Sequence, residues 1–552
     1  MRSDNVKKGD ARSPQRALLH AAGLLKSDLG KPFIGLAVGN NDLAPGHGGI
    51  VELARFAEKG IHSAGGYAFH FGVPGISEDF VMGHGGARYS LPLREIIADL
   101  TEAMIEAHHL DGLVIIAGSA ITTVGMLMGA VRTNVPTIVV TTGPMLPGEG
   151  HHRRLTLDSD LSAAIVQFRQ GKISEAELAS LELSVCPGAG EGQGIDNATT
   201  MACLVEALGL SFLSCGTALA ITAKKKRIAY VSGMRIVQMV REELTPAKIL
   251  TKAAFENAIR VGLTLCGSTA SLLHLCAIAR EVGLELPLAL FDALSHDTPQ
   301  LTDLKPNGLY FLEDLEVAGG IPAILHRLRP KLKDSPTVSD LTTLGIAEQG
   351  SVADEDVIRP LSRPYRREGG IAVLRGNLAP EGCVIRQTGL VFRKRRFRGQ
   401  ALVFDSEQEA LERVASAQQV PAETILVIRN EGPVGGPGMR EIDRILPVML
   451  DQGLLENVAI VTDGRCPTLP QGFCVGHVSP EAAVGGALAF VQNGDIIEID
   501  IPERKIHLDV SEEELQARKA QWTPSPRPVH RGTLARYREL VSPASRGAVF
   551  RR

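Results

Sequence analysis

The chain has 552 residues, of which 44% are hydrophobic, 22% are charged and 4% are aromatic, and its formal net charge is −4. This length is too great for one ordinary hydrophobic core, so we expect at least two domains. The nearly balanced charge argues against binding to nucleic acid or to an anionic membrane surface through a general positive field.

The first part of the chain alternates apolar runs with amphipathic helical patterns. Such alternation, with continuous apolar strands, predicts a parallel sheet covered by helices on both faces. The strands are expected at 33–38, 112–117 and 136–141, and the helices at 50–59, 91–109, 126–132, 155–183, 255–282 and 321–332.

The stretch 113–131 carries no charged residue and is long enough to suggest a membrane span. Gly118, Ser119 and Gly125 interrupt it, however, as a strand, loop and helix would. We therefore predict no membrane segment there.

A segment rich in proline, glycine and charge, 354–370, predicts a domain boundary. The expected organisation is an α/β domain at 1–365 and a strand-rich, β-barrel-like domain at 366–552. Short strands of the second domain are predicted at 371–374, 383–385, 400–404, 424–428, 458–461 and 496–501.

The eight cysteines form no Cys-x-x-Cys pair, and most lie within apolar or helical patterns. This usage predicts a reducing setting without a disulfide framework. No apolar segment follows the charged N-terminus, so we expect a cytoplasmic protein. Cys466, in a loop, is a candidate reactive thiol, with an inert loop cysteine as the alternative.

Three glycine-rich loops stand out: 38–46 (VGNNDLAPG), 118–125 (GSAITTVG) and 186–194 (CPGAGEGQG). Together with 82–92, 143–148, 369–382, 431–441 and 472–486, they resemble the dihydroxy-acid and sugar-acid dehydratase family. The resemblance covers almost the whole chain. It implies an α/β N-terminal domain, a C-terminal β-barrel-type domain and a homodimer.

In the resembled family, a 2,3-dihydroxy acid loses water to give a 2-keto acid. The resemblance implies that cluster iron activates the leaving hydroxyl, that Mg²⁺ binds the carboxylate, and that a serine alkoxide removes the proton. The corresponding positions are Gly46, Ser119 and Gly192 for the cluster cysteines, Glu78, Ala120, Ile121 and Glu441 for magnesium, and Pro467 for the serine.

Most of these positions lack the functional atoms that the family's chemistry uses. Glycine has no ligand atom, serine is a poor substitute for a thiolate, and isoleucine cannot coordinate a metal. We therefore expect no iron–sulfur cluster. Glu78 and Glu441 remain candidate Mg²⁺ ligands, with salt-bridged remnants of an older pocket as the alternative.

The remaining candidates also have two interpretations. His84, Arg88 and Tyr89 are candidate residues for binding a substrate carboxylate, or else His84 is buried and Arg88 forms a structural ion pair. Ser119 is a candidate nucleophile without an identifiable base, and its alternative role is to cap the following helix. The catalytic candidates are thus Glu78, Glu441, Ser119 and Cys466.

Three functions remain open. The first is a hydro-lyase-like enzyme repurposed to act on a small hydroxylated or amino acid-like carboxylic acid without a cluster. The second is a catalytically silent paralogue that binds a ligand or forms a heteromer with an active dehydratase. The third is a dihydroxy-acid dehydratase with an unconventional metal site.

Overall fold

The predicted parallel sheet is present in the computed structural model, which describes residues 1–150, 152–416, 420–467, 472–524 and 531–551. Its strand order is β2-β1-β3-β4, and all neighbours are parallel. The strands β1, β3 and β4 are buried along their whole length, which explains their continuous apolar sequences. The bounds are β1 Phe33–Gly39, β2 Tyr67–Val73, β3 Gly112–Ala117 and β4 Thr137–Thr141.

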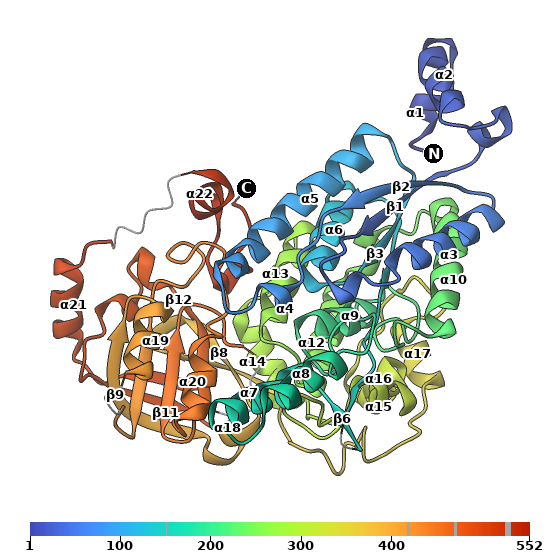
Figure 1. Cartoon of the computed structure of the whole chain (residues 1–552). Helices are drawn as coiled ribbons and strands as arrows, with labels where there is room; N and C mark the ends of the chain where they lie inside the picture. The colour runs from blue at the N-terminus through green and yellow to red at the C-terminus, as the bar shows by residue number, and fades with distance from the viewer. Residues whose placement is uncertain (151, 417–419, 468–471, 525–530, 552) are drawn as a thin grey trace.

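Helices cover both faces of this sheet, as predicted. Helices α3 (Ile50–Ser63) and α10 (Ala223–Glu242) lie on one face, and α5 (Ser90–Ala107) and α6 (Ala120–Thr133) lie on the other (Figure 1). The charge-free stretch is divided between β3 and α6, as expected. Within the described parts of the chain, no helix has the length and apolar character needed to cross a membrane.

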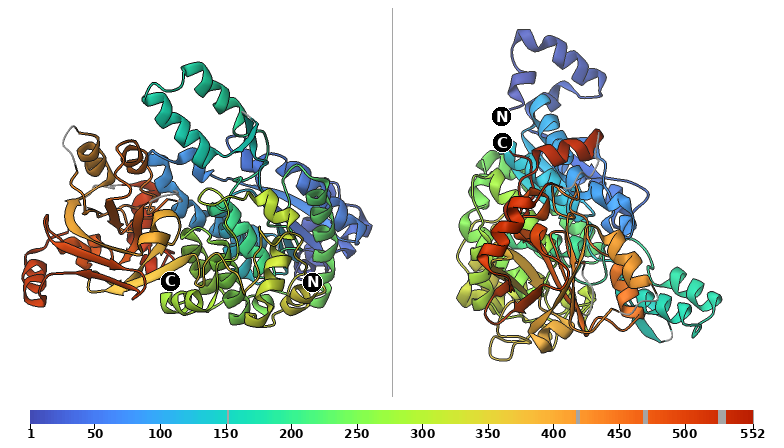
Figure 2. Two further views of the ribbon diagram at one scale, coloured as in Figure 1. Left: turned by 90° about the horizontal axis from the view of Figure 1, so that it is seen from below. Right: turned by 90° about the vertical axis from the view of Figure 1, so that its left-hand side faces the viewer.

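The remaining N-terminal elements surround this core. Two helices, α7 and α8, form an arm that projects from the α/β unit (Figure 2). The bounds are α1 Asp4–Lys7, α2 Ser13–Ala21, α4 Glu78–Val81, β5 Gly148–Gly150, β6 Arg153–Leu155, α7 Ser162–Arg169, α8 Glu175–Ser184, α9 Asn197–Ala207, α11 Pro246–Ile249, α12 Lys252–Leu265, α13 Ala270–Glu281, α14 Leu288–Asp297, α15 Leu312–Val317, α16 Gly320–Leu328 and α17 Thr343–Gln349.

The C-terminal region forms a closed eight-stranded barrel, in the order β10-β11-β12-β8-β7-β14-β13-β9. The sequence predicted six of these strands and missed β12 and β14. The bounds are β7 Ile371–Gly376, β8 Ala379–Arg386, β9 Arg396–Phe404, β10 Thr424–Ile428, β11 Val458–Thr462, β12 Phe473–Ser479, β13 Ile496–Asp500 and β14 Lys505–Leu508, with helices α18 Gly389–Lys394, α19 Glu407–Ala415, α20 Ile445–Asp451, α21 Glu512–Gln521 and α22 Gly532–Leu540.

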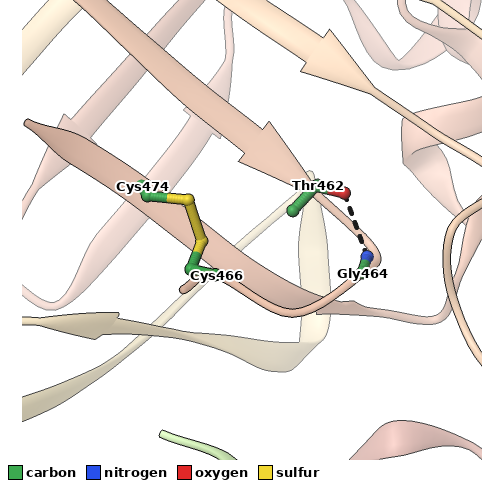
Figure 3. Close-up of a disulfide and its surroundings, with 4 residues drawn as sticks. All are labelled: Thr462, Gly464, Cys466 and Cys474. Atoms are coloured by element: carbon green, nitrogen blue, oxygen red, sulfur yellow. Dashed lines mark hydrogen bonds between the residues drawn. A yellow bond between two sulfur atoms is a disulfide. The ribbon is translucent and has the colours of Figure 1, made fainter. Parts of the chain in front are cut away.

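A disulfide joins Cys466 to Cys474 (Figure 3). The expectation of a chain without disulfides, and of Cys466 as a reactive thiol, is therefore wrong. The two cysteines meet because Cys466 follows the end of β11 while Cys474 lies in β12, and these strands are neighbours in the barrel. Their Cα atoms are 6.0 Å apart. The other six cysteines are free thiols.

Candidate functional site

Two adjoining cavities lie at the carboxyl edge of the parallel sheet, where α/β proteins place their ligands. We call the larger one, of about 230 Å³, the acidic cavity. The smaller one, of about 110 Å³, is the arginine cavity. The residues that line both are Glu78, Asp79, Asp158, Asp196 and Asn197.

The loops after β1 and β3 form one wall of the acidic cavity. Their backbones pack so closely that a side chain on Gly46 would overlap the carbonyl oxygen of Gly118. Glycine is thus required at position 46 by the packing of the two loops. Ser119 begins α6 and accepts the N–H of Thr122 at 3.3 Å, so it has the capping role given above as the alternative to a nucleophile.

The loop before α9 forms a second wall of the acidic cavity. Asp196 caps this helix, and its Oδ1 accepts the N–H of Thr199 at 2.8 Å. The other carboxylate oxygen of Asp196 occupies the space that a side chain on Gly192 would need. A carboxylate thus fills the place next to position 192, where the family resemblance puts a cluster cysteine.

Five carboxyl groups line the acidic cavity, and no lysine, arginine or histidine lines it among the described residues. Burial, together with the negative charge of the neighbouring Asp196, raises the pKa of Asp158 to about 7. Burial raises the pKa of Glu191 to about 8; Asp196 adds to this rise and Lys225 opposes it. The remaining two carboxyls belong to Glu78 and Asp79.

The arginine cavity differs in having a cation of its own. Arg465 is buried, and its Nη1 lies 3.2 Å from Oε1 of Glu78 and 3.4 Å from Oε1 of Glu441. Its Nε donates to the carbonyl of Met439 at 2.8 Å, which fixes the guanidinium in place. Burial raises the pKa of Glu441 to about 7, although Arg465 partly offsets this effect.

The donor atoms around these cavities do not fit a cluster held by three thiolates. The only thiol on the described walls is that of Cys186, and the other charged donors are carboxylates. Carboxylates suit Mg²⁺. However, the described residues contain no group of three His, Cys, Asp or Glu side chains placed to hold a metal ion. A magnesium site at Glu78 and Glu441 stays a prediction, and both carboxylates pair with Arg465.

The three residues proposed for binding a substrate carboxylate are not among those that line the cavities. His84 is exposed, and its Nδ1 accepts the N–H of Gly86 at 3.0 Å. Arg88 pairs with the buried carboxylate of Glu431 at 3.2 Å, and Tyr89 is 45% exposed. Their loop nevertheless contributes to the arginine cavity through Met82, Ala87 and Ser90.

The other positions to which the resemblance assigns a metal ligand or the catalytic serine lie in the hydrophobic core or at the cavity wall. Ala120 and Ile121 are fully buried in the first turn of α6 and belong to the hydrophobic core. Pro467 lines the arginine cavity, whereas the loop that follows it, 468–471, lies outside the described residues.

Sequence reasoning missed Asp79, Asp158, Glu191 and Arg465 as cavity residues. Asp158 lies in a single π-helical turn, Leu157–Leu161, whose first N–H donates to Oε1 of Gln193 at 3.0 Å. That hydrogen bond brings the turn to the loop that carries Glu191. The available signal was the glycine-rich loop 186–194, which contains Glu191.

Comparison with known proteins gives matches over nearly the whole chain. The family model "Dihydroxy-acid/6-phosphogluconate dehydratase N-terminal" matches 31–345, and its C-terminal counterpart matches 356–548. A protein named dihydroxy-acid dehydratase from Geobacter sulfurreducens is 50% identical over 550 residues, covering 100% of this chain and 99% of the relative. A protein of the same name from Thermodesulfovibrio yellowstonii is 47% identical, covering 100% of both chains.

Proposed function

The chain belongs to the dihydroxy-acid/6-phosphogluconate dehydratase family, and from that premise we propose that it is a hydro-lyase for a small hydroxylated carboxylic acid. The names of the full-length relatives support a working dehydratase more than the repurposed or silent paralogue considered above. The carboxyl groups that line the two cavities support a dehydration mechanism in which side-chain carboxyls accept and donate the protons.

The observation that carries this proposal is the position of Asp158. It lines both cavities, and its pKa of about 7 lets it hold or release a proton at neutral pH. Loss of water requires a base for the proton beside the carboxylate and an acid for the departing hydroxyl. Asp158 has the environment of such a group, since catalysis is most effective when the pKa lies near the working pH.

Glu441 and Arg465 have supporting roles in this proposal. The guanidinium of Arg465 holds Glu78 and Glu441 on one side of the arginine cavity. A fixed cation at this point also attracts the carboxylate of an incoming acid. The bound acid then extends from Arg465 towards Asp158, which lines the same cavity.

The test is turnover by the purified full-length protein. We expect a 2-keto acid to form from at least one of a set of short 2,3-dihydroxy acids and sugar acids, detected as its dinitrophenylhydrazone. Heat-denatured protein is the control for spontaneous dehydration. Absence of keto acid from the whole set, in protein that is folded by circular dichroism, would contradict the proposal.

A further inference from the structure

The acidic cavity has a charge imbalance that its own walls do not correct. Five carboxyl groups face it, and the described lining residues include no basic side chain. Glu78 is the exception in having an ion pair, with Arg465 on the side of the arginine cavity. A ligand that brings only a carboxylate would add a further negative charge to this space, which is electrostatically unfavourable.

Glu191 is the second, independent observation. Its side chain is only 5% exposed, and it lines the acidic cavity. Thr142 donates to its Oε1 at 3.3 Å, whereas the buried Oε2 has no hydrogen-bond partner. Buried carboxylate oxygens normally have partners, because an unsatisfied one costs free energy. The unpaired oxygen therefore indicates a donor that comes from outside the chain.

The backbone holds Glu191 in this position. Its N–H donates to the carbonyl of Gly143 at 2.9 Å, and its own carbonyl accepts the N–H of Met145 at 3.0 Å. These two hydrogen bonds fasten the loop to the segment after β4. The position of the Glu191 backbone is therefore set by the fold, and its side chain lines the acidic cavity from there.

We propose that the acidic cavity binds an ammonium group of the substrate. This inference rests on the proposed hydro-lyase function and narrows its substrate class to a hydroxylated amino acid. An ammonium group supplies three N–H donors and one positive charge; its binding displaces the proton of Glu191, whose pKa is about 8 without a ligand, and leaves a carboxylate oxygen that accepts an N–H of the ligand. The described residues offer no group of three ligands for a metal ion, which favours an organic cation.

The position of the two cavities gives the arrangement of the ligand. They share the walls formed by Glu78, Asp79, Asp158, Asp196 and Asn197, so the proposal has one small molecule extend through both. The ligand's carboxylate lies towards Arg465, and its ammonium group lies towards Glu191. A 2-amino-3-hydroxy acid carries these two charged groups on neighbouring atoms.

The test compares two probes that differ in a single group. The four stereoisomers of 2-amino-3-hydroxybutanoate and those of 2,3-dihydroxybutanoate are titrated separately into the full-length protein, with binding measured by calorimetry. We expect the best amino acid to bind at least about tenfold more tightly than the best dihydroxy acid. This difference in affinity corresponds to the free energy of one charge-assisted hydrogen bond. Equal or tighter binding of the dihydroxy acid would overturn the inference.

Variants of Glu191 test whether the ammonium group of the ligand binds at this side chain. Glu191→Gln removes the charge at nearly constant shape, so the preference for the amino acid should fall about tenfold. Glu191→Asp keeps the charge and should restore part of the preference. Glu182→Gln, the same change at an exposed position of α8, should leave it unaltered. An unchanged preference in Glu191→Gln would show that the ammonium group binds elsewhere, which contradicts the inference.

Two further results separate this inference from the proposed function. Formation of keto acid from dihydroxy acids, without binding of any amino acid, would overturn the ammonium site and leave the hydro-lyase standing. Binding of the amino acid without keto acid from any probe would contradict the hydro-lyase instead. Tight binding of Mg²⁺ or Ca²⁺ alone, lost in Glu191→Gln, would also overturn the ammonium site, because the cavity would then hold a metal ion.

Discussion

The two adjoining cavities are built from many of the same acidic residues, yet they handle negative charge in different ways. In the arginine cavity, a buried guanidinium lies against Glu78 and Glu441. In the acidic cavity no basic side chain lines the described wall, and one oxygen of Glu191 has no partner. The comparison teaches that the positive charge opposite a group of carboxylates can come from a side chain of the protein or from a bound ligand.

The largest expected effect comes from the residue that lines both cavities and is proposed to move protons. Asp158→Asn cannot exchange a proton near neutral pH, so we expect kcat to fall by about 10²- to 10⁴-fold. The measurement is steady-state formation of 2-keto acid. Asp340→Asn, at a position whose side chain is 87% exposed, is the matched control. A kcat within twofold of the original protein would remove Asp158 from the mechanism.

The next effect concerns the internal counter-ion. Arg465→Met leaves Glu78 and Glu441 without their shared cation, and breaking a buried ion pair in this way costs about 3–5 kcal/mol. We expect the free energy of unfolding in urea to fall by that amount. Arg465→Lys keeps the positive charge and should lose less. Equal losses in the two variants would mean that packing, and not charge, makes Arg465 stabilising.

The third effect concerns the disulfide beside Arg465, whose reduction measures how much this bond contributes to the free energy of unfolding. Cys466 follows Arg465 directly, and its bond to Cys474 closes a short loop with a sequence separation of 8. Reduction should lower the free energy of unfolding by about 2–3 kcal/mol in the chain-entropy account. The check is urea unfolding with and without dithiothreitol, beside thiol titration of the denatured protein. Eight titratable thiols before reduction, in place of six, would contradict the bond.

The last effect, the smallest for each step of the measurement, is the change of protein stability with pH that the carboxyl of Glu191 in the acidic cavity causes. The pKa of Glu191 is about 8 in the folded protein and 4.5 in a model peptide, so the folded state holds this proton more tightly. The contribution of Glu191 to stability is therefore present below pH 4.5 and is lost as the pH rises towards 8, by at most about 1.4 kcal/mol per pH unit.

Urea unfolding at pH 5, 6, 7 and 8 measures this slope. Glu191→Gln has no group to titrate at this position, so its slope should be flatter than that of the original protein. A bound ammonium compound should also flatten the slope, because it stabilises the charged carboxylate. Parallel pH profiles for the original protein and the variant would show that Glu191 titrates normally.

Much of the fold could be predicted because its strands are buried on both faces. The runs at 33–38, 112–117 and 458–461 are apolar throughout. Such a run can be recognised as a buried strand without knowing which strands lie beside it. The strands β12 and β14 were missed because polar residues interrupt them, as His477 and His507 show. The barrel cannot close without these two strands. The sequence therefore predicted a strand-rich, barrel-like domain but not the number or the order of its strands.

The candidate site was less predictable because its charges come from segments far apart in the chain. In the sequence, Asp158 falls in the helix predicted at 155–183 and Glu191 falls in the glycine-rich loop 186–194, and acidic side chains in such segments are usually solvated. Burial in a shared cavity, which only the fold reveals, raises the pKa of each. Arg465 was overlooked for a related reason, since its partners Glu78 and Glu441 lie on other segments.

The contact between Gly192 and Asp196 restricts how this protein can change in evolution. A side chain at position 192 would overlap the carboxylate of Asp196, and that carboxylate is held by the N–H of Thr199. Gly192→Cys alone would therefore force the helix cap to move before the new thiol gained any use. A larger side chain at 192 therefore requires the side chain of Asp196 to move, so substitutions at these two positions are coupled.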